Sequence, residues 1–170
     1  MNMVANLAEE VIVDTMSCKE DIRAVTDLLG ELQSYLGSID CLHEITVNRR
    51  LKESFEQMLS WRIAFVARYN GGIVGAAVLQ IHSADEFLGG FTKHEGPLGE
   101  IEYLVVTKEY RGHGIGQKLI AASEKYFKEA GCVRMEISYL TNNVAAINLY
   151  TKLGYKPAIG TSQKMIPENF

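Results

Sequence analysis

The stretch "YRGHGIGQKL", residues 110–119, constrains the fold of this chain more than any other segment. Glycine occupies alternate positions in it, Gly112, Gly114 and Gly116, directly before a segment with helical apolar spacing. Glycine loses more backbone freedom on folding than any other residue, so three of them this close together need a structural reason. An apolar run, "LGEIEYLVV" at 98–106, comes just before. The pattern predicts a strand that passes through a glycine turn into a helix.

A glycine turn at the start of a helix is a site where an anion can bind. Free backbone N–H groups and the positive end of the helix dipole meet there, and the missing side chains let a phosphate approach the backbone. Two common phosphate loops are excluded by spacing. Gly116 is followed by Gln117 and Lys118, whereas the P-loop continues with Lys-Ser/Thr and the dinucleotide fingerprint needs glycine at position 117. The segment therefore predicts an anion site of another loop class.

Apolar periodicity along the rest of the chain predicts a mixed α/β single domain. The clearest turn is Asn70-Gly71, a dipeptide typical of tight hairpins. The expected strands lie at 11–16, on both sides of this turn, and at 98–106 and 132–139, with shorter extended pieces at about 156–159 and 163–166. The expected helices lie at 19–35, 47–59, 115–130 and 144–153. Two loops are expected, one from about Gly37 to Glu44 and one from Ala84 to Pro97.

The composition excludes several classes of protein. A formal net charge of −4 gives no support for a nucleic-acid partner. No run approaches the ~20 apolar residues that cross a membrane, and the N-terminus has no basic leader. Cys18, Cys41 and Cys132 show neither CxxC nor metal-ligand spacing. These features predict a reduced, cytoplasmic protein with no membrane partner and no metal site.

Three motifs resemble those of the GNAT superfamily of N-acetyltransferases. The glycine stretch from Arg111 to Gly116 is similar to its Q/R-x-x-G-x-G/A signature, and "IEYLVV" at 101–106 is similar to the strand I-E-x-L-x-V that precedes it. Further along, "NVAAINLYTKLGY" at 143–155 resembles N-x-x-A-I-x-L-Y-x-K-L-G-F/Y almost position for position. The motifs occur in the family's order and cover only the second half of the chain, so the first half matches in element order alone.

The resemblance implies a GNAT-like α/β (α+β) fold, with a mixed central sheet of about six or seven strands flanked by about four helices. It places an N-terminal extension at 1–10 and the N-acetyltransferase domain at 11–170. It also implies acetyl-CoA as cosubstrate. The pyrophosphate would bind the N–H groups of Arg111, Gly112, His113, Gly114, Ile115 and Gly116, and the pantetheine arm would pair with Leu104, Val105 and Val106.

Two residues of the third motif have both a functional and a structural interpretation. Asn143 matches the asparagine that bonds the pantetheine arm, yet its position also suits a helix N-cap. Tyr150 matches the tyrosine beside the thioester sulfur, where its phenol would act as general acid, yet it could be a buried core tyrosine.

Acetyl transfer to an amine also needs a base, because an alkylammonium with a pKa near ~10.4 is almost wholly charged at neutral pH. Glu100 and Glu102 lie two positions apart on the expected strand, so both should point to one face. Glu102 is the first choice because it matches a glutamate common at that point of the family strand. Glu100 matches the catalytic glutamate of the histone-acetylating branch. Either could act through water or merely bind a cationic substrate.

The predicted function is direct transfer of acetyl from acetyl-CoA to a primary amine of a small molecule or peptide. A non-catalytic CoA-binding sensor is the alternative, and a longer acyl donor is a third reading. Cys132 begins a strand with no histidine in an evident pairing, so it is expected to be structural, and His43, His82 and His94 are expected on the surface or in substrate loops. The acceptor and the assembly, including a homodimer, stay open.

Overall fold

The computed structural model describes residues 7, 9–40, 46–83 and 96–158, and these form an α/β domain. Its helices and strands alternate irregularly along the chain. In order they are β1 (Ile12–Thr15), α2 (Lys19–Ile39), α3 (Arg49–Leu59), β2 (Ile63–Tyr69), β3 (Gly72–His82), β4 (Leu98–Val106), the 3₁₀ turn η2 (Lys108–Tyr110), α4 (Ile115–Glu129), β5 (Arg134–Ile137) and α5 (Val144–Lys152).

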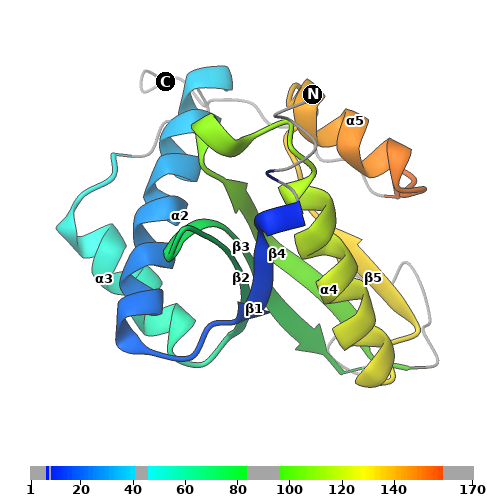
Figure 1. The fold of residues 1–170 in the computed structure, drawn as a ribbon. Coiled ribbons are helices and arrows are strands. Elements are labelled where there is room, and N and C mark those ends of the chain that lie inside the picture. The colour runs from blue at the N-terminus through cyan, green and yellow to red at the C-terminus, as the bar shows by residue number, and fades with distance from the viewer. Residues whose placement is uncertain (1–6, 8, 41–45, 84–95, 159–170) are drawn as a thin grey trace, which may run out of the picture.

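The strands form one mixed sheet in the order β1-β2-β3-β4-β5 (Figure 1). Neighbouring strands are antiparallel except β4 and β5, which are parallel. The predicted hairpin is confirmed: Asn70 and Gly71 join β2 to β3 with φ angles of 48° and 79°, which this dipeptide adopts readily. The described residues thus give five strands, slightly fewer than the six or seven expected. The extended piece expected at 163–166 lies outside the described residues, and 156–158 do not form a strand.

Helices cover both faces of the sheet, with α2 and α3 on one face and α4 on the other (Figure 1). Helical apolar spacing buries Val25, Leu29 and Leu59 on the first face. Leu119, Ile120 and Phe127 are buried on the second. Gly99 of β4 permits the close approach of α4, because an added Cβ there would lie 2.4 Å from the Phe127 ring.

Two elements differ in length from the sequence-based prediction. Helix α2 continues to Ile39, beyond the expected end at Tyr35, because Leu32, Leu36 and Ile39 extend its apolar spacing into a segment expected to be a loop. Strand β5 is limited to Arg134–Ile137, where 132–139 was expected. The segments 41–45 and 84–95, which contain most of the expected substrate loops, lie outside the described residues.

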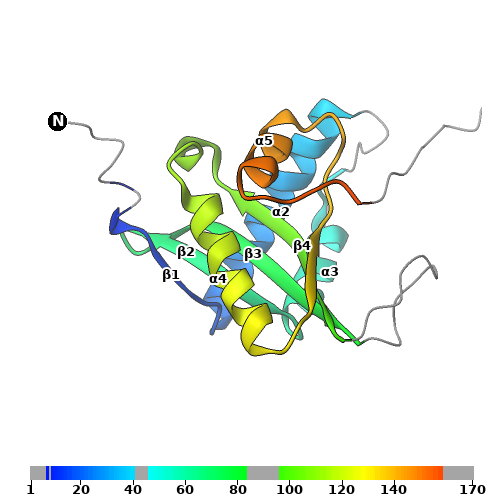
Figure 2. The same ribbon diagram turned by 90° about the vertical axis from the view of Figure 1, so that its right-hand side faces the viewer.

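Strands β4 and β5 pair along only part of the length of β4. They pair from Leu98 with Arg134 to Ile101 with Ile137, and β4 then continues to Val106 with no strand on that side in the described structure. The chain after β5 leads instead to α5, at the open end of the sheet (Figures 1 and 2). Among the described helices, none is long and apolar enough to span a membrane.

Candidate active site

The C-terminal half of β4 has one edge with which no strand of the described structure pairs. Leu104, Val105 and Val106 pair with Ala77, Ala76 and Gly75 of β3, so their other edge faces the gap where β5 has diverged. Val105 is buried on the α2 face, while Leu104 and Val106 pack against the α4 cluster. An unpaired strand edge presents backbone donors and acceptors to which an extended ligand can bond.

The glycine loop follows this edge, and its glycines serve different purposes. Gly112 and Gly114 have φ angles of 80° and 78°, in the left-handed region, and an added Cβ at either would meet no atom within 4 Å. Backbone conformation therefore requires glycine at these positions, and open space lies in front of them. At Gly116 an added Cβ would lie 3.4 Å from Leu149 of α5, an ordinary contact distance, so this position lies where α4 packs against α5 and has room for one methyl group.

The loop ends in the free N-terminus of α4. The first helical backbone donor is Lys118, whose N–H bonds to the Gly114 carbonyl at 3.1 Å. The preceding N–H groups of Ile115, Gly116 and Gln117 therefore have no carbonyl in the helix to bond. The Nδ1 atom of His113 is also buried and has no hydrogen-bond partner among the described residues. Together with the helix dipole, the three backbone N–H groups can stabilise an anion.

Arg111 ties the loop to two other elements. Its Nε donates to the Val106 carbonyl at 2.8 Å, and its guanidinium carbon lies 4.9 Å from the centre of the Tyr35 ring in α2. A cation over an aromatic ring is held by the ring's negative face. The loop is therefore fixed between β4 and α2.

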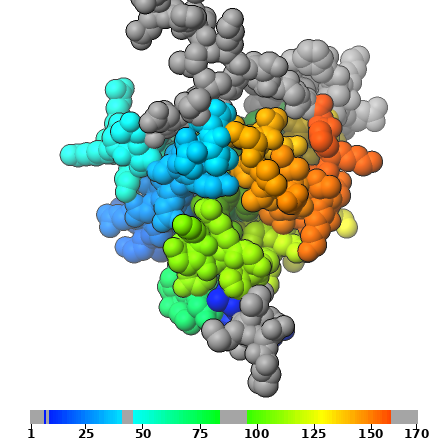
Figure 3. Space-filling model, turned by 90° about the horizontal axis from the view of Figure 1, so that it is seen from above, coloured from blue at the N-terminus to red at the C-terminus, as the bar shows by residue number. Residues whose placement is uncertain are grey.

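Helix α5 is attached across the open end of the sheet. Asn143 caps it, since its side-chain oxygen accepts a hydrogen bond from the Ala146 N–H at 3.2 Å. The neighbouring Asn142 donates to the Ile39 carbonyl at 2.6 Å, which joins the start of α5 to the end of α2. Figure 3 shows these two helix ends side by side above the sheet. The capping interpretation of Asn143 is thus confirmed, and a further bond to a ligand is left to its amide N–H groups.

Tyr150 is packed among aromatic rings beside a groove. It is 7% exposed, and its ring centre lies 5.6 Å from that of Tyr139 and 6.0 Å from that of Tyr155. All three line a groove of about 1180 Å³ along β5 and α5. Burial, with a smaller contribution from Tyr139, raises the pKa of Tyr150 to about 12. The phenol is therefore neutral at ordinary pH and is a proton donor rather than an anion.

Glu102 occupies a β-bulge and forms an ion pair. Tyr103 pairs with Val78 and Ile101 with Leu79, so Glu102 between them has no partner in β3. The extra residue shifts the alternation of β4: Ile101 packs on the α4 face and Tyr103 on the α2 face. The Glu102 carboxylate accepts hydrogen bonds from Arg62 at 2.7 Å and 3.4 Å, and the same guanidinium bonds Gln80 at 2.7 Å.

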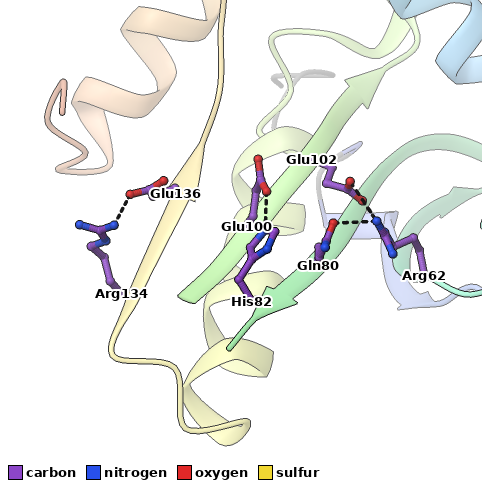
Figure 4. Close-up of polar contacts among 7 residues, drawn as sticks. All are labelled: Arg62, Gln80, His82, Glu100, Glu102, Arg134 and Glu136. Carbon is purple, nitrogen blue, oxygen red and sulfur yellow. Dashed lines mark hydrogen bonds and ion pairs between the residues drawn. The ribbon is translucent and has the colours of Figure 1, made fainter. Parts of the chain in front are cut away.

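Glu100 bonds a different partner, His82 of β3, at 2.7 Å between Oε2 and Nε2. Figure 4 shows both glutamates on the face that carries His82, Gln80 and Arg62, in line with the prediction that they share a face. On β5, Arg134 and Glu136 form a further ion pair at 2.5 Å. This sheet face therefore carries charged and polar side chains from β3, β4 and β5, and from Arg62 directly before β2.

Sequence reasoning missed Arg62, Gln80 and His82 as members of this cluster. The hairpin turn places Gln80 and His82 near the far end of β3, but the pairing of β3 with β4 that brings them beside Glu100 has no local sequence signal. The bulges in β3 and β4 have no clear sequence signal. His43 and His94 lie outside the described residues. Burial raises the pKa of the Cys132 thiol, which disfavours a reactive thiolate.

No group of three or more potential metal ligands occurs in the part of the chain that the structure describes. The anion donors that the structure describes are backbone N–H groups at the start of α4.

Known proteins are similar to this chain in sequence and in architecture. The family model described as "Acetyltransferase (GNAT) family" matches residues 34–155. An acetyltransferase of Yersinia pestis (strain Pestoides F) is 33% identical over 113 residues, 66% of this chain and 67% of that protein. One from Yersinia enterocolitica is 31% identical with the same coverage.

Solved structures give the same architecture. A putative acetyl transferase from Pyrococcus furiosus has a TM-score of 0.71 at 25% identity, and the match covers 92% of this chain and 100% of that one. The aminoglycoside N-acetyltransferase AAC(6')-Iy, solved in complex with CoA, has a TM-score of 0.68 at 20% identity and covers 92% and 94%.

Proposed function

This chain belongs to the GNAT family of acetyltransferases, and from that premise we propose that it transfers acetyl from acetyl-CoA to a primary amine of a small molecule or peptide. The observation that carries the proposal is the free edge of β4, directly beside the N-terminus of α4. One feature suits an extended amide-containing arm and the other suits a phosphate. A protein of similar fold was solved with CoA bound.

In this proposal each part of the donor has its own binding residues. The pyrophosphate binds the N–H groups from Gly112 to Gly116, in the open space before Gly112 and Gly114. The backbone N–H of Arg111, expected to join them, donates instead to the Lys108 carbonyl at 3.3 Å. The pantetheine arm pairs with Leu104, Val105 and Val106, and Asn143 donates to it from the start of α5. His113 contributes through its backbone, and its unpartnered Nδ1 supports a polar ligand at this loop. These contacts require no metal.

Tyr150 is proposed as the general acid. Departure of CoA leaves a thiolate, and a neutral phenol can protonate it. With its pKa raised to about 12, Tyr150 holds its proton at neutral pH, and this proton is available to the thiolate although burial makes the phenol a weaker acid than a free one. Its position, more than its acidity, supports the role. The groove beside its ring gives a reactant access to a residue that is otherwise buried.

The proposed base is Glu100, with Glu102 as the second candidate. Sequence reasoning ranked them in the opposite order, but the contacts of Glu102 support the exchange. The Arg62 guanidinium bonds both Glu102 oxygens, so each of them already has a hydrogen-bond donor. In Glu100, Oε2 bonds His82 and Oε1 has no hydrogen-bond partner among the described residues, so Oε1 can accept a proton from the amine directly or through water.

The test is turnover with an amine panel. Purified protein would be mixed with acetyl-CoA in metal-free buffer and with amines, polyamines, amino acids or peptides, and both CoA release and the acetylated product would be measured. Product formation is the expected result. Tight CoA binding by calorimetry without product from any acceptor would instead support a CoA-binding sensor, and no CoA binding would overturn the donor site itself.

A further inference from the structure

We propose that Arg62 and Arg134 set the charge of the acceptor site, and that they select acceptors with one ammonium group over diamines and polyamines. Each arginine pairs with a carboxylate beside Glu100, so Glu100 is the carboxylate that stays open to a cation among the described residues of this sheet face. The inference rests on the proposed function, since it places the acceptor amine at Glu100. It adds the charge class of that acceptor.

Glu100 lies between two other carboxylates. Glu102 follows two positions later in β4 on the same face, and Glu136 of β5 is the register partner of Glu100 (Figure 4). Neighbouring strands lie about 4.8 Å apart, and successive residues advance roughly 3.3 Å along a strand. Three unpaired carboxylates at such distances would repel one another and together attract a polycation.

An arginine pairs with each of the two flanking carboxylates. Arg62 Nε lies 2.7 Å from Glu102 Oε2, and its Nη2 lies 3.4 Å from Oε1. On β5, Arg134 lies 2.5 Å from Glu136. The four side chains are between 19% and 31% exposed, so salt and water screen these pairs less than they screen pairs on an open surface. Each pair is therefore nearly neutral towards an approaching substrate.

No arginine pairs with Glu100 in the part of the chain that the structure describes. Its Oε2 bonds His82 Nε2 at 2.7 Å, and an imidazole with its proton on Nε2 donates this bond without carrying a charge. The phenol of Tyr103 is neutral too, because burial and, to a smaller extent, the charge of Glu102 raise its pKa. With a neutral imidazole, this cluster carries one net negative charge, which one ammonium group balances.

A second ammonium group on the acceptor meets no unpaired anion among the described residues of this face. The carboxylates closest to Glu100 each hold an arginine already, and this arginine repels a further cation. A monoamine therefore keeps its full interaction with Glu100, whereas a diamine must direct its second charge to the solvent. Removing either arginine would free a carboxylate close to that second charge.

The test is the ratio of kcat/KM for butane-1-amine to that for butane-1,4-diamine, counted per amino group. The wild type should prefer the monoamine. Arg62→Gln and Arg134→Gln should each lower the ratio by about 5-fold, the size of a partly exposed ion pair. Arg62→Lys keeps the charge and should keep the ratio. Because both substrates are compared on the same protein, a partial loss of folded enzyme cancels.

Substitution of the partner carboxylate should have the opposite effect. Glu102→Gln leaves the charge of Arg62 unbalanced, so the ratio should rise above that of the wild type. Arg62→Gln combined with Glu102→Gln removes both charges of the pair and should return the ratio to the wild-type value. If Arg62 only positioned its neighbours, the double mutant would keep the altered ratio of Arg62→Gln, and the inference would be overturned.

Arg68→Gln is the matched control. The Arg68 side chain is 29% exposed, compared with 30% for Arg62, and it pairs with Asp21 at 2.8 Å near the other end of β2. Its loss changes the net charge of the protein equally and should leave the ratio unchanged. A wild-type preference for the diamine, or equal ratios in Arg62→Gln and wild type, overturns the inference and leaves the acetyltransferase proposal standing. Acetylation of no amine overturns both.

Discussion

Arg62 and Glu102, 40 residues apart in the sequence, are joined by hydrogen bonds of 2.7 Å and 3.4 Å at the β-bulge of β4. The bond to Glu102 is the main cause that raises the pKa of the Arg62 guanidinium. Since the same guanidinium holds Gln80, the segment before β2 is joined to both β3 and β4 at one side chain. This pair fixes one carboxylate of β4, whereas the other, Glu100, is the proposed base.

The two glutamates should therefore respond differently to the same substitution. Glu100→Gln should lower kcat by roughly 10²- to 10⁴-fold, most strongly where the acceptor amine is protonated, with partial recovery at high pH. Glu102→Gln should change thermal stability and acceptor KM more than kcat, because it breaks the contact with Arg62. Full pH–rate profiles measure both effects. The reverse pattern would return the role of base to Glu102.

Tyr150→Phe should reduce single-turnover acetyl transfer by roughly 10²- to 10⁴-fold, because it removes the proton donor and keeps the ring. CoA affinity by calorimetry should stay near that of the wild type. A thioester whose thiol is more acidic than that of CoA should retain more activity in the mutant, since its thiolate leaves more easily. Unchanged chemistry in single-turnover measurements would leave Tyr150 as a core residue alone.

The same substitution should change alkaline stability. The folded pKa of about 12 is above the unfolded value near ~10, so the contribution of the neutral phenol is complete below about pH 10 and is lost as pH rises towards 12. Between these values the wild type should lose up to about 3 kcal/mol that Tyr150→Phe does not lose. Urea unfolding of both proteins at pH 9 and pH 11.5 measures the difference. Equal losses would contradict a buried, neutral phenol.

Gly114→Val should abolish CoA binding, because the branched side chain enters the proposed phosphate site. The chain offers a matched control in Gly131, which ends α4 with a φ of 79° and equally open surroundings. Both substitutions should lower stability by about 1–2 kcal/mol through left-handed backbone strain. Calorimetry should show lost CoA affinity only for Gly114→Val, and equal affinities would remove the loop from the donor site.

Gly99→Ala should be destabilising without touching the proposed site. Its Cβ would meet the Phe127 ring at 2.4 Å, and overpacking of a core costs about 1–3 kcal/mol. Phe127→Leu should offset part of this loss, so the double mutant should be more stable than the sum of the single effects predicts. Additive effects in denaturant unfolding would show that the strand and helix separate freely.

Sequence reasoning succeeded where local signals dominate. The bounds of β4, the hairpin at Asn70-Gly71 and the start of α4 are set by apolar runs and glycines that act over a few residues. The fold class and family followed from motifs of the same kind.

What the sequence left undetermined depends on distant contacts. The divergence of β5 after Ile137 and the extra residue at Glu102 come from packing across the sheet. The pairing of Arg62 with Glu102, and of His82 with Glu100, follows from strand register that bulges shift by one residue. No pattern within one segment reports these partners, so the ranking of the two glutamates needed the structure.

The difference between Gly114 and Gly116 accounts for the form of the motif itself. The family signature accepts glycine alone at the position of Gly114 but glycine or alanine at that of Gly116. In this chain the first has a backbone angle that strains any side chain, whereas the second lies inside α4, where one methyl group would reach Leu149 at an ordinary contact distance of 3.4 Å. In this chain, therefore, the backbone dihedral angle restricts the position of Gly114 to glycine. The space between α4 and α5 sets the size of the residue at the position of Gly116, and a methyl group fits there.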